Sequence, residues 1–194
     1  SHIICEMIIE NKGISDFYND KENQSFSVPF FVDMNKLFED FVTKLFEVYC
    51  HDKIFTQKKQ KAWIIDDTKQ NIKMIPDIIL QNKRKEITII DVKYKNKLGY
   101  NDLYQIGFYI HEYTSENKEQ EIKYAYAILP NFSETPNIQK SYQATKSKIK
   151  IYTKFISMDE YIQLIAKPNS RKYIVDKIQT EILNPDDIKK HYLQ

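Results

Sequence analysis

Apolar residues recur at helical spacing in two stretches of the chain. Residues 33–52 are predicted to form a helix with a wide buried stripe, with Asp33 as a suitable N-cap. Residues 101–114 are predicted to form a second helix, with Asn101 as N-cap and Gly107 allowing a close approach to a sheet. The apolar positions that define the two stripes are Met34, Leu37, Phe38, Phe41, Val42, Leu45, Phe46 and Tyr49 in the first, and Leu103, Ile106, Ile110 and Tyr113 in the second.

Short runs of alternating or continuous apolar residues predict the strands. They fall at residues 53–57, 62–66, 74–80, 86–94, 122–129 and 149–157, and helices are expected at 158–166 and 170–183. The strands at 74–80 and 86–94 flank a short charged linker, which indicates a hairpin, and a strand–helix–strand passage follows it. This order predicts an α/β fold with a mixed central sheet flanked by helices.

The two strands of the predicted hairpin carry charged residues where aliphatic ones are expected. Asp77 interrupts the run Ile-Pro-Asp-Ile-Ile-Leu, and Asp91 and Lys93 interrupt Ile-Thr-Ile-Ile-Asp-Val-Lys. Because side chains alternate along a strand, Asp91 and Lys93 emerge on the same face. Charges among Ile, Leu and Val are costly to desolvate unless they pair with each other or bind a metal. A structural ion pair and a functional site therefore both explain this pattern.

Composition limits the class of protein. A chain of 194 residues, 42% hydrophobic and 29% charged, suits one globular domain over residues 1–194, with a core at about 33–157 and C-terminal helices at about 158–194. The net charge of +2 indicates that any nucleic-acid site depends on local lysine clusters. Cys5 and Cys50 fit neither a metal-binding spacing nor a disulfide framework, and we expect a cytoplasmic protein without a membrane span. Because Ser1-His2 directly precedes an apolar run, we expect a fragment of a longer chain.

The charged hairpin resembles the signature of the PD-(D/E)xK nuclease superfamily. Pro76-Asp77 matches the first half and Asp91-Val92-Lys93 the second. A more specific resemblance is to the nuclease domain of the McrC family, the cleavage subunit of McrBC-type restriction systems for modified cytosine. It rests on the blocks Asp-Met-Asn-Lys-Leu-Phe-Glu-Asp-Phe-Val from residue 33, Asp-Val-Lys-Tyr-Lys from residue 91 and Asp-Leu-Tyr-Gln-Ile-Gly-Phe-Tyr from residue 102. The resemblance implies that the mixed central sheet and its flanking helices have the restriction-endonuclease-like fold.

The chemistry of phosphodiester hydrolysis assigns roles to these residues. Mg²⁺ prefers oxygen ligands, and we expect Asp77, Asp91 and the Val92 carbonyl to bind it, with Mn²⁺ able to substitute. In this superfamily the helix before the sheet often adds an acidic residue to the metal site, and Glu39 suits that role. Lys93 is expected to orient or deprotonate the attacking water and to stabilise charge on the phosphate.

Further residues are expected to support the site. Gln105 is predicted to place its amide near Lys93 or the phosphate, and Tyr109, four residues on, to buttress it. Tyr94, Lys95 and Lys97 are predicted to contact the phosphate backbone, which sets affinity and register rather than sequence preference.

The family resemblance implies a Mg²⁺-dependent endonuclease that cuts double-stranded DNA in bacterial or archaeal defence. It also implies a partner, a hexameric AAA+ GTPase of the McrB type that binds through a region outside this chain, and it implies no small-molecule substrate. Two alternatives remain open. The first alternative is a catalytically idle DNA-binding scaffold with this fold. The second is a stand-alone nuclease or junction resolvase with the same metal site. Replacing Asp91 separates the idle scaffold from the enzymes, because only an enzyme loses cleavage.

Overall fold

The computed structural model describes residues 32–56, 60–65, 70–116, 121–132, 140–143 and 149–184. The chain divides into two compact units, residues 1–34 and 35–194, and the second contains nearly all of the described residues. Its elements in order are α2 (Met34–Tyr49), β1 (Lys53–Thr56), β2 (Gln60–Ile65), β3 (Gln70–Met74), β4 (Ile78–Gln81), β5 (Ile87–Val92), α3 (Tyr100–Glu116), β6 (Ile122–Pro130), β7 (Ser141–Gln143), β8 (Lys150–Ile156), α4 (Met158–Ile165), α5 (Arg171–Lys177) and the π-helix η2 (Ile178–Ile182). None of the described helices is long and apolar enough to cross a membrane.

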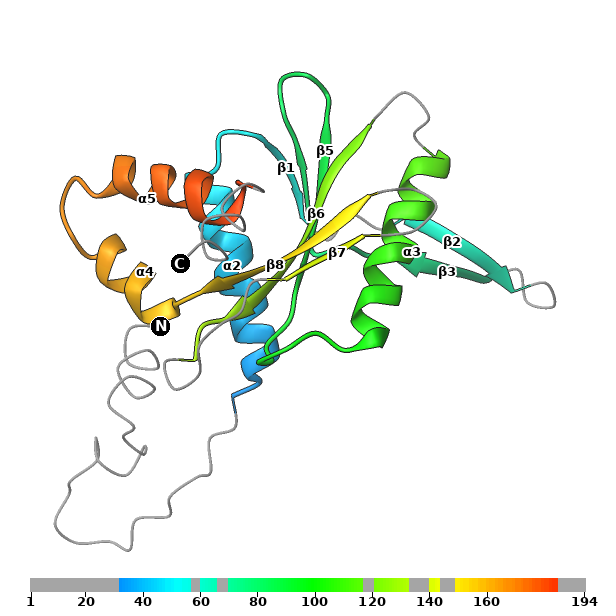
Figure 1. The fold of residues 1–194 in the computed structure, drawn as a ribbon, viewed down its shortest axis with the longest axis horizontal. Coiled ribbons are helices and arrows are strands. Elements are labelled where there is room, and N and C mark those ends of the chain that lie inside the picture. The colour runs from blue at the N-terminus through cyan, green and yellow to red at the C-terminus, as the bar shows by residue number, and fades with distance from the viewer. Residues whose placement is uncertain are drawn as a thin grey trace, which may run out of the picture. The chain divides into compact units, whose positions relative to one another are not determined.

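Six strands form one mixed sheet in the order β1-β4-β5-β6-β8-β7 (Figure 1). Strands β5, β6 and β8 run parallel to one another, whereas β1, β4 and β7 pair antiparallel to their neighbours. The helix α3 connects the parallel neighbours β5 and β6, as a crossover between parallel strands requires. The predicted mixed α/β sheet with flanking helices is confirmed.

Each face of the sheet has its own hydrophobic core. On one face, α2, α4, α5 and η2 pack against the side chains of Ile78, Leu80, Ile90 and Val92. On the other face, α3 packs against Ile79, Ile87 and Ile89. Alternate residues of β4 and β5 thus contribute to the two cores, and both strands are buried on both sides. Their ends are therefore the places where polar groups reach these cores.

Several sequence predictions about elements are corrected. The strand expected at 74–80 begins only at Ile78, because Pro76 cannot donate a ladder hydrogen bond. Strands β3 and β7 were not predicted, and β3 pairs with β2 in a separate two-stranded sheet. The prediction of a single domain over 1–194 stays a prediction.

Two predictions about α3 are wrong. The helix begins at Tyr100, so Asn101 lies inside its first turn and is not the N-cap. Gly107 does not serve a close approach, since a Cβ built there would meet no atom within 4 Å. Its φ is also not positive, so neither space nor backbone conformation requires glycine at this position.

Candidate functional site

The hairpin register sets Asp77 and Asp91 opposite each other. Strands β4 and β5 pair Ile79 with Ile89 and Ile78 with Ile90, and continuing this register by one residue puts Asp77 opposite Asp91. Asp91 belongs by alternation to the face that α3 covers, because it lies two residues from Ile89 in the core on that face, and Asp77 immediately precedes β4. Directly opposite residues of an antiparallel pair have Cβ atoms about 4.5–5.5 Å apart. The sequence prediction that these two carboxylates come together is consistent with this register.

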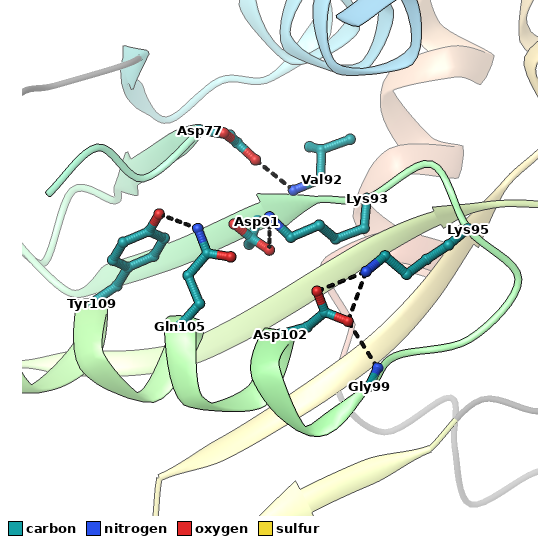
Figure 2. A network of polar contacts seen from close by, with 9 residues as sticks. All are labelled: Asp77, Asp91, Val92, Lys93, Lys95, Gly99, Asp102, Gln105 and Tyr109. Atoms are coloured by element: carbon teal, nitrogen blue, oxygen red, sulfur yellow. Dashed lines mark hydrogen bonds and ion pairs between the residues drawn. The ribbon is translucent and has the colours of Figure 1, made fainter. Parts of the chain in front are cut away.

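Asp77 is held by the main chain of the neighbouring strand. The Val92 amide donates a hydrogen bond to Asp77 Oδ2 at 2.7 Å (Figure 2). This amide lies beyond the last residue pair of β4 and β5, which is Ile78 with Ile90. The Asp77 carboxylate thus accepts a hydrogen bond from a main-chain amide of β5 that has no paired residue on β4. The contact fixes one carboxylate oxygen and leaves Oδ1 for another ligand.

Asp91 and Lys93 form a close ion pair on the same side of the sheet. Lys93 Nζ lies 3.1 Å from Asp91 Oδ1 and 3.0 Å from Oδ2, and it donates a hydrogen bond to Oδ1 (Figure 2). Asp91 is only 1% exposed, whereas the Lys93 side chain is 20% exposed. Although Oδ2 is close to the ammonium, it accepts no hydrogen bond of acceptable geometry in the described structure. An unsatisfied buried carboxylate oxygen is costly, so this oxygen is available to a further cation.

The electrostatics show a shortage of positive charge around the two aspartates. The pKa of Asp77 is raised to about 7, mainly by burial and also by the charges of Asp91 and Glu39, against the opposing effects of the Val92 N–H and Lys93. Burial also raises the pKa of Asp91, although Lys93 counteracts it. Burial works to lower the pKa of Lys93, but the neighbouring carboxylates of Asp91 and Asp77 raise it above its usual value overall. Lys93 is therefore an ammonium ion in this arrangement and not a base.

Glu39 comes from a helix on the other face of the sheet. It lies on α2, the helix that covers the face opposite α3, and its side chain is 25% exposed. Lys36 Nζ is 3.5 Å from Glu39 Oε1, one turn back along the helix. The effect of Glu39 on the pKa of Asp77 shows that the two carboxylates are electrostatic neighbours. Glu39 is thus close enough to influence Asp77, and its role as a metal ligand stays a prediction.

Asp102 is a buried residue of the site that the sequence analysis did not single out. It lies in the first turn of α3, and its two oxygens accept hydrogen bonds from Lys95 Nζ at 2.8 and 2.9 Å (Figure 2). Its Oδ2 also accepts from the Gly99 amide at 2.8 Å, as the N3 acid of a capping box does. These contacts fix the loop that leads from Lys93 to α3. The spacing of three residues from Gly99 to an acid at the start of a helix was the available sequence signal.

The remaining predicted residues lie in different surroundings. Gln105 Nε2 donates to the Tyr109 hydroxyl at 2.6 Å, as the i, i+4 spacing suggested, and Tyr109 is an electrostatic neighbour of Asp91 and Lys93. Lys97 is exposed. The Tyr94 ring packs against Phe38 and Phe132, with centroids 5.8 and 5.4 Å away. Tyr94 is engaged in packing because it alternates to the α2 face, so this placement gives no support to a nucleic-acid contact.

The donor set suits a hard divalent cation. Asp77 and Asp91 present carboxylate oxygens next to the main chain at Val92, and Asp91 Oδ2 accepts no hydrogen bond in the described structure. Mg²⁺ typically takes one or two carboxylates and keeps several waters. Within the described ranges no three His, Cys, Asp or Glu side chains are grouped closely enough to form a ready ligand cluster. The residues therefore fit an ion held by two aspartates and water rather than a closed protein cage.

This arrangement defines a class of site, in which two facing carboxylates and one lysine lie at the end of an α/β hairpin. Comparison with known proteins gives the family. Residues 2–129 match the model of the McrBC 5-methylcytosine restriction system component, so the chain belongs to this family and is a McrC-like subunit, as the sequence predicted.

The fold also resembles a solved structure. The match is to a chain of the refined half-complex from the tetradecameric assembly of Thermococcus gammatolerans McrB AAA+ hexamers with bound McrC, with a TM-score of 0.55 and 16% identity. The alignment covers 79% of this chain and 34% of the archaeal one, so this chain spans about a third of the length of its structural relative. No curated protein matches the sequence well enough to be reported as a relative.

Proposed function

We propose that this chain is the nuclease part of a McrBC-type restriction system and hydrolyses phosphodiester bonds of double-stranded DNA with the help of Mg²⁺. The observation that carries the proposal is the register that faces Asp77 with Asp91 next to Lys93, with Asp91 Oδ2 accepting no hydrogen bond in the described structure. The Pro-Asp and Asp-Val-Lys segments that build this geometry are the two halves of the PD-(D/E)xK signature. Membership in the McrBC family supports the same function.

Each residue has a defined task in this proposal. Asp77 and Asp91 hold the cation, and the Val92 N–H keeps the Asp77 carboxylate turned toward the site. The ion supplies charge neutralisation at the phosphate and a water of lowered pKa. Lys93, as an ammonium ion, stabilises charge that develops on the phosphate oxygens and is not the general base in the metal-free state. We assign Gln105, whose amide donates to the Tyr109 hydroxyl, the task of orienting the water or phosphate, and Glu39 that of adding negative charge near Asp77.

The partner follows from the structural relative, which is a complex of McrB AAA+ hexamers with McrC. We infer a McrB-type AAA+ GTPase as the motor that delivers DNA to this site, in the cytoplasm of a bacterium or archaeon. Foreign DNA with modified cytosine is the proposed target, and we assign recognition of the modified base to the motor subunit. In this proposal the chain cuts and its partner selects.

A plasmid cleavage assay tests the proposal. The purified chain is incubated with its cognate motor and GTP in Mg²⁺, in Mn²⁺ and in EDTA, and the Asp91→Asn variant is compared with the wild type. Asp159→Asn serves as the matched control, since Asp159 is an exposed acid on α4, at the start of the C-terminal helices. The expected result is cleavage by the wild type and the control in either metal, none in EDTA, and none by Asp91→Asn, which keeps its DNA affinity.

Two results would contradict the proposal. If no metal supports cleavage with the motor and GTP present, the chain is an idle scaffold. If Asp91→Asn cuts as fast as the wild type, the catalytic centre lies elsewhere. Cleavage of RNA or of branched DNA without any motor would replace the restriction role by that of a stand-alone nuclease of the same fold.

A further inference from the structure

Two tyrosines at the start of α3 are exposed to an unusual degree for large aromatic side chains. Tyr100 is 82% exposed and Tyr104 is 75% exposed, the highest values among the large hydrophobic residues that the structure describes. They are spaced i, i+4, so their rings lie on the same side of the helix, one turn apart. Isolated exposed hydrophobic residues need no explanation, but two adjacent aromatic rings form a surface that suits a ligand.

The charge around these rings is positive or neutral. The exposed positions in the first two turns of α3 are Tyr100, Asn101, Tyr104 and Gln105, which include no acid. The one carboxylate of these turns, Asp102, is buried and neutralised by Lys95. Lys97 lies three residues before Tyr100 and is exposed. Exposed aromatic rings on a helix turn without exposed acids, three residues after an exposed lysine, favour a polyanion that carries flat groups, which describes nucleic acid.

The loop that carries Lys97 is held in place from both ends. Asp102 binds the Lys95 ammonium through both oxygens and also binds the Gly99 amide. Lys93, at the start of the same loop, is fixed by its ion pair with Asp91. Lys97 therefore lies on a segment whose neighbours Lys93, Lys95 and Gly99 are anchored to Asp91 and Asp102 (Figure 2). Tyr100 begins the helix that follows, and Tyr104 lies one residue before Gln105. The surface is preorganised, which lowers the entropic cost of binding.

We propose that Tyr100 and Tyr104 form a stacking platform for unpaired bases of the nucleic acid next to the cut, with Lys97 on the adjoining phosphate. This inference rests on the proposed nuclease function and extends it, because it assigns a contact to bases that have left the duplex. Stacking on tyrosine tolerates any base, since every base has an aromatic face. The platform therefore retains a strand near the cut without reading its sequence.

Fluorescence anisotropy with labelled DNA in EDTA tests the platform without cleavage. The probes are a single-stranded oligonucleotide and the blunt duplex of the same sequence. The variants are Tyr100→Ala/Tyr104→Ala, the matched Tyr100→Phe/Tyr104→Phe pair, which keeps both rings, and Tyr173→Ala, which removes an exposed tyrosine on α5. Circular dichroism of each variant confirms an unchanged fold, which is expected because all three positions are exposed.

The platform predicts that the double alanine variant binds the single strand at least about thirtyfold more weakly than the wild type, and the duplex less than about threefold more weakly. The double phenylalanine variant and Tyr173→Ala bind like the wild type. Lys97→Ala is expected to lower the number of counterions released on binding by about one, measured as the slope of log affinity against log salt concentration. If the double alanine variant binds the single strand as tightly as the wild type, the proposal is overturned, and a protein partner becomes the explanation for the exposed rings.

Other outcomes also decide. An equal loss on duplex and single strand would replace base stacking by a general contact with the backbone and overturn the platform. A loss in the phenylalanine pair as large as in the alanine pair would do the same, because it would assign the contact to the hydroxyl groups. The test is independent of the nuclease function. A wild type that binds single strands through these rings but never cleaves DNA would keep the platform and reject the enzyme.

Discussion

The carboxylate of Asp77 should destabilise the metal-free fold, so replacing it by Asn should stabilise the protein. Burial and the neighbouring Asp91 raise the pKa of Asp77 from 3.8 to about 7. Each unit of such a shift corresponds to about 1.4 kcal/mol, so ionised Asp77 costs the folded state up to about 4 kcal/mol. Asn removes the charge, and its side-chain oxygen can still accept the hydrogen bond from the Val92 amide.

The pH dependence gives the sign of the effect. Below the ordinary pKa of 3.8, Asp77 is protonated in both the folded and the unfolded chain, so it contributes nothing to the pH dependence of stability. Between 3.8 and about 7 the folded chain binds the extra proton, and stability is lost as the pH rises through this window. The free energy of unfolding of Asp77→Asn should therefore exceed that of the wild type most clearly above neutral pH.

Urea denaturation in EDTA, at several pH values across this window, measures the difference. The expected gain is largest at about pH 8 and shrinks toward about pH 4, and the exposed control Asp159→Asn should show no such trend. If Asp77→Asn is less stable than the wild type at about pH 8, the carboxylate stabilises the fold. That result would refute the claim that this site lacks positive charge.

Two further substitutions test the surroundings of the site. Gly107→Ala should raise the free energy of unfolding by about 1 kcal/mol, because a Cβ fits there and alanine favours the helix; a destabilised variant in thermal unfolding would contradict this. Asp102→Ala should lower the free energy of unfolding by about 1–3 kcal/mol, because Lys95 and the Gly99 amide lose their acceptor. Faster amide hydrogen exchange at Gly99 than in the wild type checks this second prediction, and unchanged exchange would contradict it.

The sequence predicted the sheet because its strands obey simple patterns. Strand β5 is apolar and β-branched except at the residues that form the site, and α2 repeats apolar residues every three or four positions. Strand β3, with the sequence Gln-Asn-Ile-Lys-Met, alternates only over its last four residues and has no continuous apolar run, and so it was missed. Pairing with a neighbouring strand decides such a segment, and pairing is not visible in local sequence.

The site was predictable where chemistry conflicts with burial. Asp77, Asp91 and Lys93 stand out because charges among aliphatic residues require an explanation. Asp102 was missed because it lies in a polar segment, where an acid is ordinary, and its importance comes from the fold of the loop around it. Tyr94 was predicted to contact nucleic acid because it is next to Lys93 and Lys95; its ring packs against Phe38, and the nucleic-acid contact stays a prediction.

Mn²⁺ binding, measured by calorimetry, tests most directly whether Asp77 and Asp91 form a metal site. The account predicts that the wild type binds Mn²⁺ in the absence of DNA, and that Asp77→Asn and Asp91→Asn each lose this binding while both remain folded. The exposed control Asp159→Asn should bind like the wild type. Unchanged Mn²⁺ affinity in both site variants would contradict the account, because the cation would then be held by other residues.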